Sequence, residues 1–469
     1  MSFEKPHIMT RLSIIRRMEL KPMLKDAWAL AIEAMSWIEL QRLGERLALA
    51  RATKQLAVTD PAALGLAHRL VFETQRRLNT IDAALELVLK PKSLSEYRLG
   101  LQSFLRLYTY RVLFEGSDYE QAVAMAGIAR SILGWRQLTD IEEVLGKILS
   151  LQLNETLAGV SDEERIGLQT YVPTWFVKYC FKMLGRSQAL SFLESTSQPT
   201  PTYVRLNTLK APEETCLQRL IDEGVTVEKE PLLKYTYRVV EPRKPLLRTQ
   251  SFRDGLFYVQ DKASCLAVEV ADPKPNNVVL DVCAAPGAKT TYMAQLMQNQ
   301  GTIYSVDYSR RRIREWKSET IRMGVTNAAA IVADAQKPLP VNVIADLVVL
   351  DPPCTSTGAF GKTPSAKWRL TKRSMFNMAA VQWNMLNASA LCVKEGGHLV
   401  YSTCSITSEE NEMLIEKFLK WHSEFALVDT VPRLGVQGLR GLDKCQRLYP
   451  QLHDCNGFFV AKLVKEESS

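Results

Sequence analysis

Several features that mark common functional classes are missing from this sequence. No run of about 18 apolar residues occurs, so no membrane-spanning helix is expected. The first residues, Met1 to Pro6, lack the apolar core of a secretory signal. There is no Cys-x-x-Cys pair and there are only five histidines, which argues against a zinc site and against histidine as a general base. We therefore expect a cytoplasmic protein that binds neither a metal nor a membrane.

The usual phosphate-binding and disulfide signatures are missing as well. Neither the Gly-x-Gly-x-x-Gly pattern of dinucleotide-binding folds nor a Walker-type Gly-Lys-Thr fits the spacing of the glycines. The nine cysteines are odd in number and scattered, which argues against a disulfide framework and indicates a reducing compartment. The net charge of +8 is compatible with a polyanionic partner, although it does not identify one.

The 469 residues are enough for two or three domains, and the sequence pattern changes twice. Residues 1–193 show helical periodicity and predict an all-α domain. Residues 194–255 open with a Pro-containing linker and then combine short strands with one helix, which predicts a small α+β module. Residues 256–469 alternate strands and helices, as a doubly wound, Rossmann-like α/β sheet requires.

Local patterns refine this division. In the helical domain, Asp60 before Pro61 is typical of a helix start, and Ser117 with Glu120 has the spacing of a capping box. In the third domain the strand patterns span 278–281, 302–307, 328–333, 346–350 and 398–402, and a weak alternation over 457–463 predicts an edge hairpin strand. The helical patterns there span 289–298, 310–323 and 371–395.

Basic side chains recur in the first two domains. Those of the helical domain either line a solvated helix face or form a surface for phosphates; they are Arg69, Arg76, Arg77, Arg98, Arg106 and Arg111. Those of the small module suit contacts with an RNA backbone and a purely structural role equally well; they are Arg238, Arg243, Lys244 and Arg248.

The third domain is organised around residues 277–290, where an apolar strand pattern ends at Asp281 and a turn of small residues leads into a helix. The turn and the helix start comprise Cys283, Ala284, Ala285, Pro286, Gly287, Ala288 and Lys289. Small residues let the backbone approach a ligand, and a helix N-terminus offers unpaired amides and a positive dipole. A turn with one glycine can also be only a turn, so its interpretation depends on the residues downstream.

Four aspartates stand at or just past predicted strand ends, where open α/β sheets bind their ligands; they are Asp281, Asp307, Asp334 and Asp351. Asp307 follows Asp281 at close to the spacing at which an acid after the second strand accepts ribose hydroxyls. Any one of them could be a turn former. Four at corresponding positions predict an adenosine-type ligand.

Two cysteines directly follow predicted buried strands. Cys354 comes after Asp351-Pro352-Pro353, and Cys404 comes after Tyr401-Ser402-Thr403. A single buried cysteine is often structural. Two thiols at adjacent strand ends of a ligand-binding sheet are hard to explain by packing alone.

From about Pro201 to its end the chain resembles the RsmB/Sun (Fmu) family of RNA cytosine-C5 methyltransferases. The resemblance rests on Arg205-Leu206-Asn207, Tyr258-Val259-Gln260-Asp261 with Ser264, Asp281 to Gly287 with Lys289-Thr290, Asp351-Pro352-Pro353-Cys354, Ser402-Thr403-Cys404 with Glu410-Asn411-Glu412, and Gly457-Phe458-Phe459. The pattern around 68–114 is similar, more weakly, to the NusB-like domain of RsmB-type members.

The resemblance implies S-adenosylmethionine as methyl donor, an RNA substrate (rRNA or tRNA), and an RRM-like, RNA-binding small module on a monomeric protein. It implies that Cys404 is the nucleophile that adds to cytosine C6 and that Cys354 assists release of the product. Asp351 would hydrogen-bond N3 and the amine of the base, and Lys289 is a candidate for lowering the pKa of the attacking thiol. The turn from Cys283 to Lys289 would hold the methionine part of the cofactor. The residues implied for the rest of the cofactor site are Asp307 for the ribose, Asp334 for the adenine amine, Arg312 and Asp351.

The chain departs from the family pattern at two places. Ala288 stands where the family usually has a second glycine. The stretch Asp351-Pro352-Pro353-Cys354-Thr355-Ser356-Thr357-Gly358 differs from the commoner Asp-Ala-Pro-Cys-Ser-Gly in one small residue and two inserted ones, which predicts a loop of altered detail.

Two other functions compete with this interpretation. DNA cytosine methyltransferases also use a Pro-Cys, but as the nucleophile, and they lack a Thr-Cys after the next strand, so Cys404 argues against them. A catalytically silent, RNA-binding ribosome-assembly factor with a retained cofactor fold would be favoured by loss of a cysteine or of Asp351, and all of these residues are present.

Overall fold

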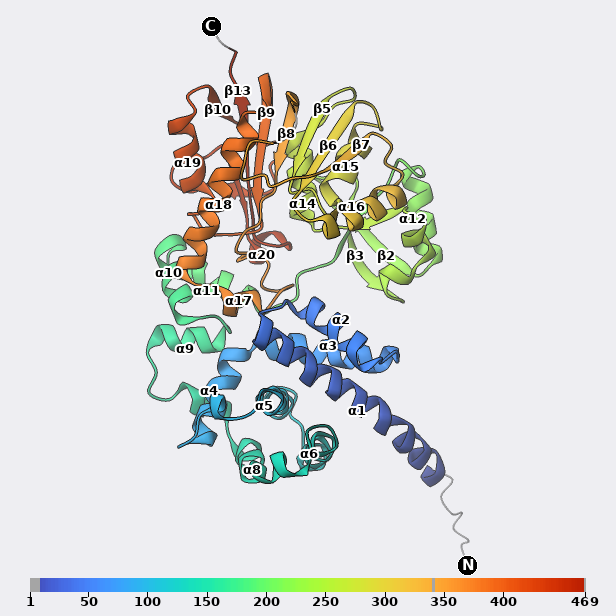
Figure 1. Ribbon diagram of the computed structural model, residues 1–469, viewed down its shortest axis with the longest axis vertical. Coiled ribbons are helices and arrows are strands. Elements are labelled where there is room, and N and C mark those ends of the chain that lie inside the picture. The colour runs from blue at the N-terminus through green and yellow to red at the C-terminus, as the bar shows by residue number, and fades with distance from the viewer. Residues whose placement is uncertain (1–8, 340–341, 468–469) are drawn as a thin grey trace, which may run out of the picture. The chain divides into compact units, whose positions relative to one another are not determined.

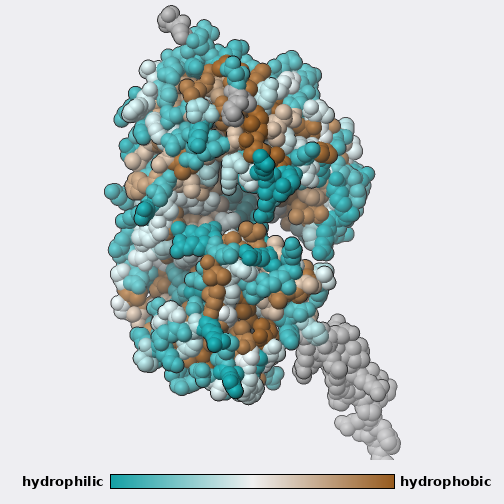
Figure 2. Space-filling model, in the orientation of Figure 1, coloured by the Kyte–Doolittle hydropathy of each residue, from teal (hydrophilic) through white to brown (hydrophobic). Residues whose placement is uncertain are grey.

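The computed structural model describes residues 9–339 and 342–467, which divide into two compact units (Figure 1). One unit comprises Met1–Ser197 with Thr363–Arg369, and the other comprises Gln198–Lys362 with Leu370–Ser469. Residues 1–6, in which no secretory signal was expected, lie outside the described part. Over the described ranges, no helix is both long and apolar enough to cross a membrane. The face shown in Figure 2 is mostly hydrophilic, with small hydrophobic patches.

The first unit is helical, as its periodicity predicted. Its core is built from side chains such as Leu70, Phe104, Tyr108 and Ile148, all buried. Its longer helices are α1 (Met9–Gln41), α2 (Glu45–Leu56), α3 (Pro61–Arg76), α4 (Leu78–Leu89), α5 (Leu99–Leu113), α6 (Tyr119–Leu133), α8 (Glu142–Ser150), α9 (Asp162–Gln169), α10 (Thr174–Leu184) and α11 (Arg186–Ser195), with the short α7 (Trp135–Thr139).

One of the two predicted helix starts is confirmed. The Asp60 side chain accepts the N–H of Ala62 at 3.0 Å, with Pro61 as the first residue of α3. The prediction of a capping box at Ser117 is wrong, because Asp118 caps α6 by accepting the N–H of Gln121 at 2.8 Å. An aspartate next to the serine offers a charged acceptor, which suits the positive end of a helix better.

The arginines of this unit interact mostly with residues of the same unit. Five of the six singled out from the sequence form ion pairs with acids of the same unit; they are Arg69, Arg76, Arg77, Arg106 and Arg111. Arg106 is buried, and its Nε lies 2.8 Å from Asp82 Oδ1. Neither a solvated face nor a phosphate-binding surface describes this arginine.

The chain returns to the helical unit once after leaving it. Residues 363–369, which include α17 (Ala366–Arg369), pack among the N-terminal helices. Trp368 Nε1 donates to the carbonyl oxygen of Gln75 at 2.7 Å, and the Ser365 N–H donates to Glu45. A segment placed by sequence in the third domain is therefore part of the first compact unit.

The second unit contains a small antiparallel sheet with the strand order β2-β3-β1-β4. It is the α+β module expected from the sequence, and β4 lies just beyond the boundary drawn at residue 255. Its elements are β1 (Tyr203–Leu206), α12 (Glu213–Asp222), β2 (Val225–Lys229), β3 (Thr236–Pro242), α13 (Gln250–Arg253) and β4 (Phe257–Val259).

The main sheet of this unit is mixed. Its parallel part has the order β7-β6-β5-β8-β9, so β5 and β8 flank the point where the strand order reverses. These strands are β5 (Val278–Val282), β6 (Thr302–Asp307), β7 (Ala328–Val332), β8 (Ala345–Leu350) and β9 (Val393–Thr403). The antiparallel part adds β10 (Phe425–Val428), β11 (Val436–Gln437), β12 (Gln446–Leu448) and β13 (Phe458–Lys465), with the short α20 (Pro450–His453).

Two sequence predictions for this sheet are wrong. The strand at 457–463 is not at an edge, because β13 pairs with β9 on one side and with β12 and β10 on the other. Its first four residues are buried, which an edge position would not provide. The helix predicted to 395 ends at Ala390, and β9 begins at Val393, so the Gly396-Gly397 pair lies inside the strand rather than before it.

Helices cover both faces of the sheet (Figure 1). Leu280 and Val282 of β5 face α18 (Lys372–Ala390) and α19 (Glu412–Trp421), whereas Val279 faces α14 (Lys262–Ala271) and α15 (Ala288–Leu296). This alternation buries both sides of each parallel strand. The doubly wound arrangement is therefore confirmed, and α16 (Arg310–Met323) lies beside α15.

Candidate functional site

The two cysteines singled out from the sequence meet at the carboxyl edge of the sheet. Strands β8 and β9 are parallel neighbours with Leu350 paired to Tyr401, so the residues that follow them emerge side by side. The Sγ atoms of Cys354 and Cys404 lie 3.1 Å apart. All nine cysteines are free thiols, as their number and scatter predicted.

The two thiols have different proton affinities. The hydrogen bond to Cys404, together with burial, raises the pKa of Cys354 well above its usual value. The same hydrogen bond lowers the pKa of Cys404, against the opposing effect of burial. Of the two thiols, Cys404 therefore ionises more readily, to the nucleophilic thiolate, and Cys354 keeps its proton more readily.

Asp351 lies beside the thiols and is held from two sides. Lys289 Nζ is 2.5 Å from Asp351 Oδ2, and Ser402 Oγ donates to Oδ1 at 3.1 Å. Burial acts to lower the pKa of Lys289, but the charge of Asp351 and the hydrogen bond to it raise the pKa above its usual value. The Lys289 ammonium is thus engaged with Asp351 and also interacts with Cys404, whose pKa is lowered most by the hydrogen bond from Cys354 and further by the one from Ser356.

The turn before α15 is held against the second strand. Ala284 donates its N–H to the Val306 carbonyl at 3.0 Å, and Ala285 donates to Asp307 Oδ2 at 3.3 Å. Arg312 Nη1 lies 2.8 Å from the same Oδ2 and also binds the Ala285 carbonyl. Asp307 and Arg312 therefore hold the turn in shape from the side of β6 and α16.

At two further residues of the turn the backbone has a positive φ, and at Gly287 it packs closely against a neighbouring side chain. Gly287 has a φ of 113°, and a Cβ there would lie 3.2 Å from Trp316 Cδ1. Cys283 also has a positive φ of 67°, and burial raises the pKa of its thiol to about 12. Pro286 and Ala288 complete the turn into the helix.

Three of the four predicted aspartates come together. The charges of Asp351 and Asp307 act on Asp281, whose pKa is raised to about 7, chiefly by burial. Thr290 Oγ1 donates to Asp281 Oδ2 at 2.5 Å, so this carboxyl ties the end of β5 to α15. Asp334 follows β7, where Ala333 donates its N–H to the Asp307 carbonyl at 3.2 Å; its own side chain is exposed and accepts the N–H of Gln336 at 3.1 Å.

Comparison with known families and structures identifies this arrangement. The model of the 16S rRNA methyltransferases RsmB/F matches residues 268–464, and that of the ferredoxin-like domain of RsmF/B-like methyltransferases matches residues 172–244. The solved structure of a methyltransferase homologue from Pyrococcus horikoshii is 31% identical, has a TM-score of 0.60, and is covered over 100% of its length by 65% of this chain. The chain belongs to the RsmB/RsmF methyltransferase family.

Curated relatives extend the comparison. The 25S rRNA (cytosine-C(5))-methyltransferase nop2 of Schizosaccharomyces pombe is 35% identical over 303 residues, which are 61% of this chain and 49% of nop2. The chain thus spans about half the length of that relative. A probable ribosomal RNA small subunit methyltransferase B of Bacillus subtilis is 27% identical over 446 residues, which are 93% of this chain and 98% of that protein.

One residue of the RsmB/RsmF motifs that sequence reasoning left without a role joins the two cysteine loops. Glu410 is fully buried, and its Oε2 accepts the Thr355 N–H and Gln382 Nε2, each at 2.9 Å. Its Oε1 accepts the hydroxyls of Ser405 and Thr407 at 2.7 Å and binds that of Thr355. Thr355 follows Cys354 and Ser405 follows Cys404, so Glu410 holds both loops. Its place in Glu410-Asn411-Glu412 was the signal for it in the sequence.

The family motif at the start of the small module also has a structural explanation. Arg205 is fully buried, and its Nη1 donates to Gln260 Oε1 at 2.7 Å and to the Ala288 carbonyl at 2.8 Å. Asn207 donates to the carbonyls of Gly255 and Met323, each at 2.8 Å. This motif joins the module to the turn at α15, and its arginine is unavailable to RNA.

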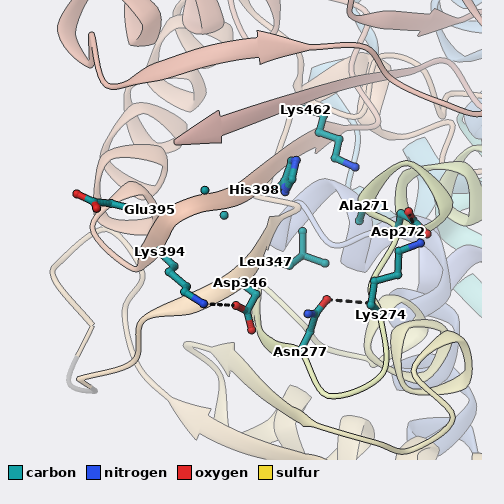
Figure 3. A pocket seen from close by; sticks show the side chains of 12 residues that line it. Ala271, Asp272, Lys274, Asn277, Asp346, Leu347, Lys394, Glu395, His398 and Lys462 are labelled. Carbon is teal, nitrogen blue, oxygen red and sulfur yellow. Dashed lines mark hydrogen bonds and ion pairs between the residues drawn. The ribbon is translucent and has the colours of Figure 1, made fainter. Parts of the chain in front are cut away.

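A cavity of about 310 Å³ lies at the opposite edge of the main sheet (Figure 3). It contains both acids and lysines, but they neutralise each other. Asp272 pairs with Lys274 at 2.7 Å and Asp346 with Lys394 at 3.2 Å, while Lys462 donates to a backbone carbonyl of α14. In residues 9–339 and 342–467, no cluster of three or more His, Cys, Asp or Glu side chains could hold a metal ion.

Proposed function

We propose that this protein transfers a methyl group from S-adenosylmethionine to C5 of a cytosine in RNA. The observation that carries the proposal is the pair of thiols 3.1 Å apart, one raised and one lowered in pKa, beside Asp351 at the carboxyl edge of a methyltransferase sheet. Cytosine C5 is a poor nucleophile until a thiolate adds to C6, so a poised thiolate is the group this reaction needs.

The residues of the turn fit the methyl donor. The turn of small residues stands at the N-terminus of α15, and buried Asp307 lies at the end of the second strand. We assign Cys283 to Lys289 to its methionine part, Asp307 and Asp334 to its ribose and adenine, and Arg312 to the support of the turn. When bound, S-adenosylmethionine supplies the methyl group as an electrophile.

Cys404 acts as the nucleophile. Its sulfur forms a bond to C6, and the electron pair of the C5–C6 double bond moves toward N3 and makes C5 nucleophilic. Asp351 faces N3 and the amine of the base, and Lys289 holds Asp351 in place from the other side. After methylation, water takes the C5 proton, the electron pair of the C5–H bond restores the C5–C6 double bond, and the S–C6 electrons return to Cys404.

Cys354 assists this last step. Its pKa is raised, so it carries its proton, and it is the thiol nearest the sulfur that must leave. A hydrogen bond from Cys354 stabilises the departing thiolate of Cys404, as it does in the free protein. Without that donor the S–C6 bond persists and the protein remains attached to RNA.

The substrate is proposed as ribosomal or transfer RNA. The base must be unpaired or flipped out of its helix to reach a thiol within the sheet edge. The small module brings further cations for the RNA backbone, among them Arg238 and Arg243. The family relationship supports ribosomal RNA, since nop2 and the Bacillus subtilis relative carry that substrate in their names.

The test distinguishes the proposed roles of the two thiols, Cys404 and Cys354. Purified protein, S-adenosylmethionine with a labelled methyl group and RNA from cells lacking the protein are incubated, and the RNA is digested to nucleosides. We expect labelled 5-methylcytidine from the wild type, none from Cys404→Ala, and an RNA–protein adduct on denaturing gels from Cys354→Ala. The double variant is the control and should give neither product nor adduct.

The proposal fails if the wild type labels no cytidine. An adduct formed by Cys404→Ala but absent from Cys354→Ala would reverse the two roles. Bisulfite sequencing of RNA from cells with and without the protein then identifies the cytosine.

A further inference from the structure

Ser356 is a polar residue in contact with both sulfur atoms. Its Oγ lies 3.5 Å from Cys404 Sγ and 3.9 Å from Cys354 Sγ. In the structure the Cys404 thiol donates to Ser356 Oγ. A thiolate has no proton to donate, so the hydroxyl of Ser356 becomes the donor once Cys404 is ionised. Ser356 belongs to the stretch in which this chain departs from the common family sequence.

The backbone of Ser356 is held in a conformation that suits glycine better than serine. Its φ is 56°, in the left-handed region that side chains other than those of Gly, Asn and Asp rarely adopt. Such a conformation persists only where the surroundings over-determine it, and it is enriched at functional sites.

The neighbours of Ser356 supply that constraint. Thr355 on one side is bound by Glu410, and Thr357 on the other exchanges a hydrogen bond with Ser405 at 2.8 Å and accepts the Ile406 N–H at 2.9 Å. Gly358 donates its N–H to the Cys404 carbonyl at 3.0 Å. The loop is therefore pinned on both sides of Ser356, and its hydroxyl is left next to the thiols.

The ionisable groups that act on Cys404 are Cys354, Asp351, Glu410 and Lys289. The two carboxylates disfavour a thiolate, and the ammonium of Lys289 is engaged with Asp351. The hydrogen bond from Cys354 lowers the pKa of Cys404 most, burial raises it, and the hydrogen bond from Ser356 lowers it further. Neutral donors, more than a nearby cation, thus stabilise the anion.

We propose that Ser356 is a catalytic residue whose hydroxyl donates a hydrogen bond to the Cys404 sulfur and keeps it in the anionic form that attacks the base. No proton is transferred, since Ser356 stays neutral before, during and after the attack. The role in turnover rests on the proposed methyl transfer, but the effect on the thiol can be measured without RNA.

Two substitutions distinguish the effect of the Ser356 hydroxyl from the effect of the strained backbone. Ser356→Ala removes the hydroxyl and keeps the strained conformation, whereas Ser356→Gly removes the hydroxyl and relieves the strain. The protein is treated with iodoacetamide from pH 5 to pH 10, and alkylation of the tryptic peptide that contains Cys404 is followed by mass spectrometry. We expect the midpoint of the rate profile to move up by about one pH unit in both variants, with alkylation about tenfold slower at pH 7.

The two variants should differ in melting temperature but show the same loss of Cys404 reactivity. Ser356→Gly should melt at a higher temperature than Ser356→Ala, which shows that the loop is intact while the reactivity of the thiol has fallen. In the RNA assay, kcat should fall about tenfold at pH 7 in both and recover at higher pH. Ser318→Ala, at an exposed position on α16, is the matched control and should follow the wild type.

Two results overturn the proposal. One is a Cys404 profile in both variants that coincides with that of the wild type. The other is a shift in Ser356→Ala alone, which would assign the effect to the backbone. A shifted profile in both variants with no methylation by the wild type supports the thiol assignment and rejects the methyltransferase function instead.

Discussion

Strand β8 carries an aspartate–lysine pair near each of its ends, and the two pairs behave differently. At the start of the strand, Asp346 pairs with Lys394 at 3.2 Å, and the lysine side chain is 60% exposed. Just past its end, Asp351 pairs with Lys289 at 2.5 Å, and the lysine side chain is 9% exposed. The lysine is thus solvated at one edge of the sheet and nearly buried at the other, whereas the side chains of Asp346 and Asp351 are about equally exposed, at 31% and 32%.

The acids at these two edges also titrate in opposite senses. A hydrogen bond from the Val278 N–H and the neighbouring Lys394 lower the pKa of Asp346, although burial opposes them. At the carboxyl edge, burial raises the pKa of Asp281 to about 7. The comparison shows that burial and hydrogen-bond partners, more than residue type, set the direction in which the pKa values of these carboxyl groups shift.

Of the substitutions that test this comparison, the one at Lys289 should have the largest effect. Lys289→Met keeps the volume of the side chain but leaves Asp351 without its cation, so the carboxylate loses the orientation that its proposed contact with the base requires. We expect kcat/KM for RNA methylation to fall by about 100- to 1000-fold. A variant that keeps wild-type kcat/KM would show that this pair is only structural.

Substitutions of Glu410 test whether its hydrogen bonds to the two cysteine loops position the thiols. Glu410→Ala leaves two backbone or amide donors and three hydroxyls without their common acceptor, and we expect kcat to fall by about 100-fold. Glu410→Gln should lose about tenfold or less, because its oxygen can take the place of Oε2 while the hydroxyls accept from its amide. Equal losses in both variants would contradict this account.

The pH dependence of stability sharpens the contrast between the acids. Because the pKa of Asp281 is higher in the folded than in the unfolded protein, its contribution to the free energy of unfolding is lost as pH rises from about 4 to about 7. In Asp281→Asn the free energy of unfolding, measured by urea denaturation, should no longer show this loss, which is on the order of 4 kcal/mol over that range. Asp346→Asn is the control of opposite sign, because a lowered pKa stabilises above the unfolded value and that stability is lost as pH falls.

The smallest effect is expected at the opposite edge. Lys394→Met is the same substitution as at Lys289, but it removes an exposed partner whose charge water already screens. We expect the free energy of unfolding to change by less than about 1 kcal/mol and kcat/KM by less than about twofold. A large loss of activity would show that the cavity of Figure 3 communicates with the thiols.

Much of the sheet could be predicted because its signals are local. The β-branched runs at 278–281 and 346–350 became β5 and β8 with nearly the same bounds, and the turn before Gly287 was placed correctly. The helix start at Ser117 and the edge position of β13 could not be predicted. They depend on a competing neighbour and on a partner strand far away in the sequence.

The sequence by itself determined which residues reach the carboxyl edge of the sheet, because strand alternation and the family motifs are written in the order of the chain. It determined the pair of cysteines, the small-residue turn and the acids. Only the tertiary structure decided what each one touches: that Lys289 serves Asp351 more than the thiolate, that Glu410 joins two loops, and that Ser356 lies against both sulfurs. The physical reason is that hydrogen bonds and pKa values depend on distances and on burial, and these arise only when distant segments pack together.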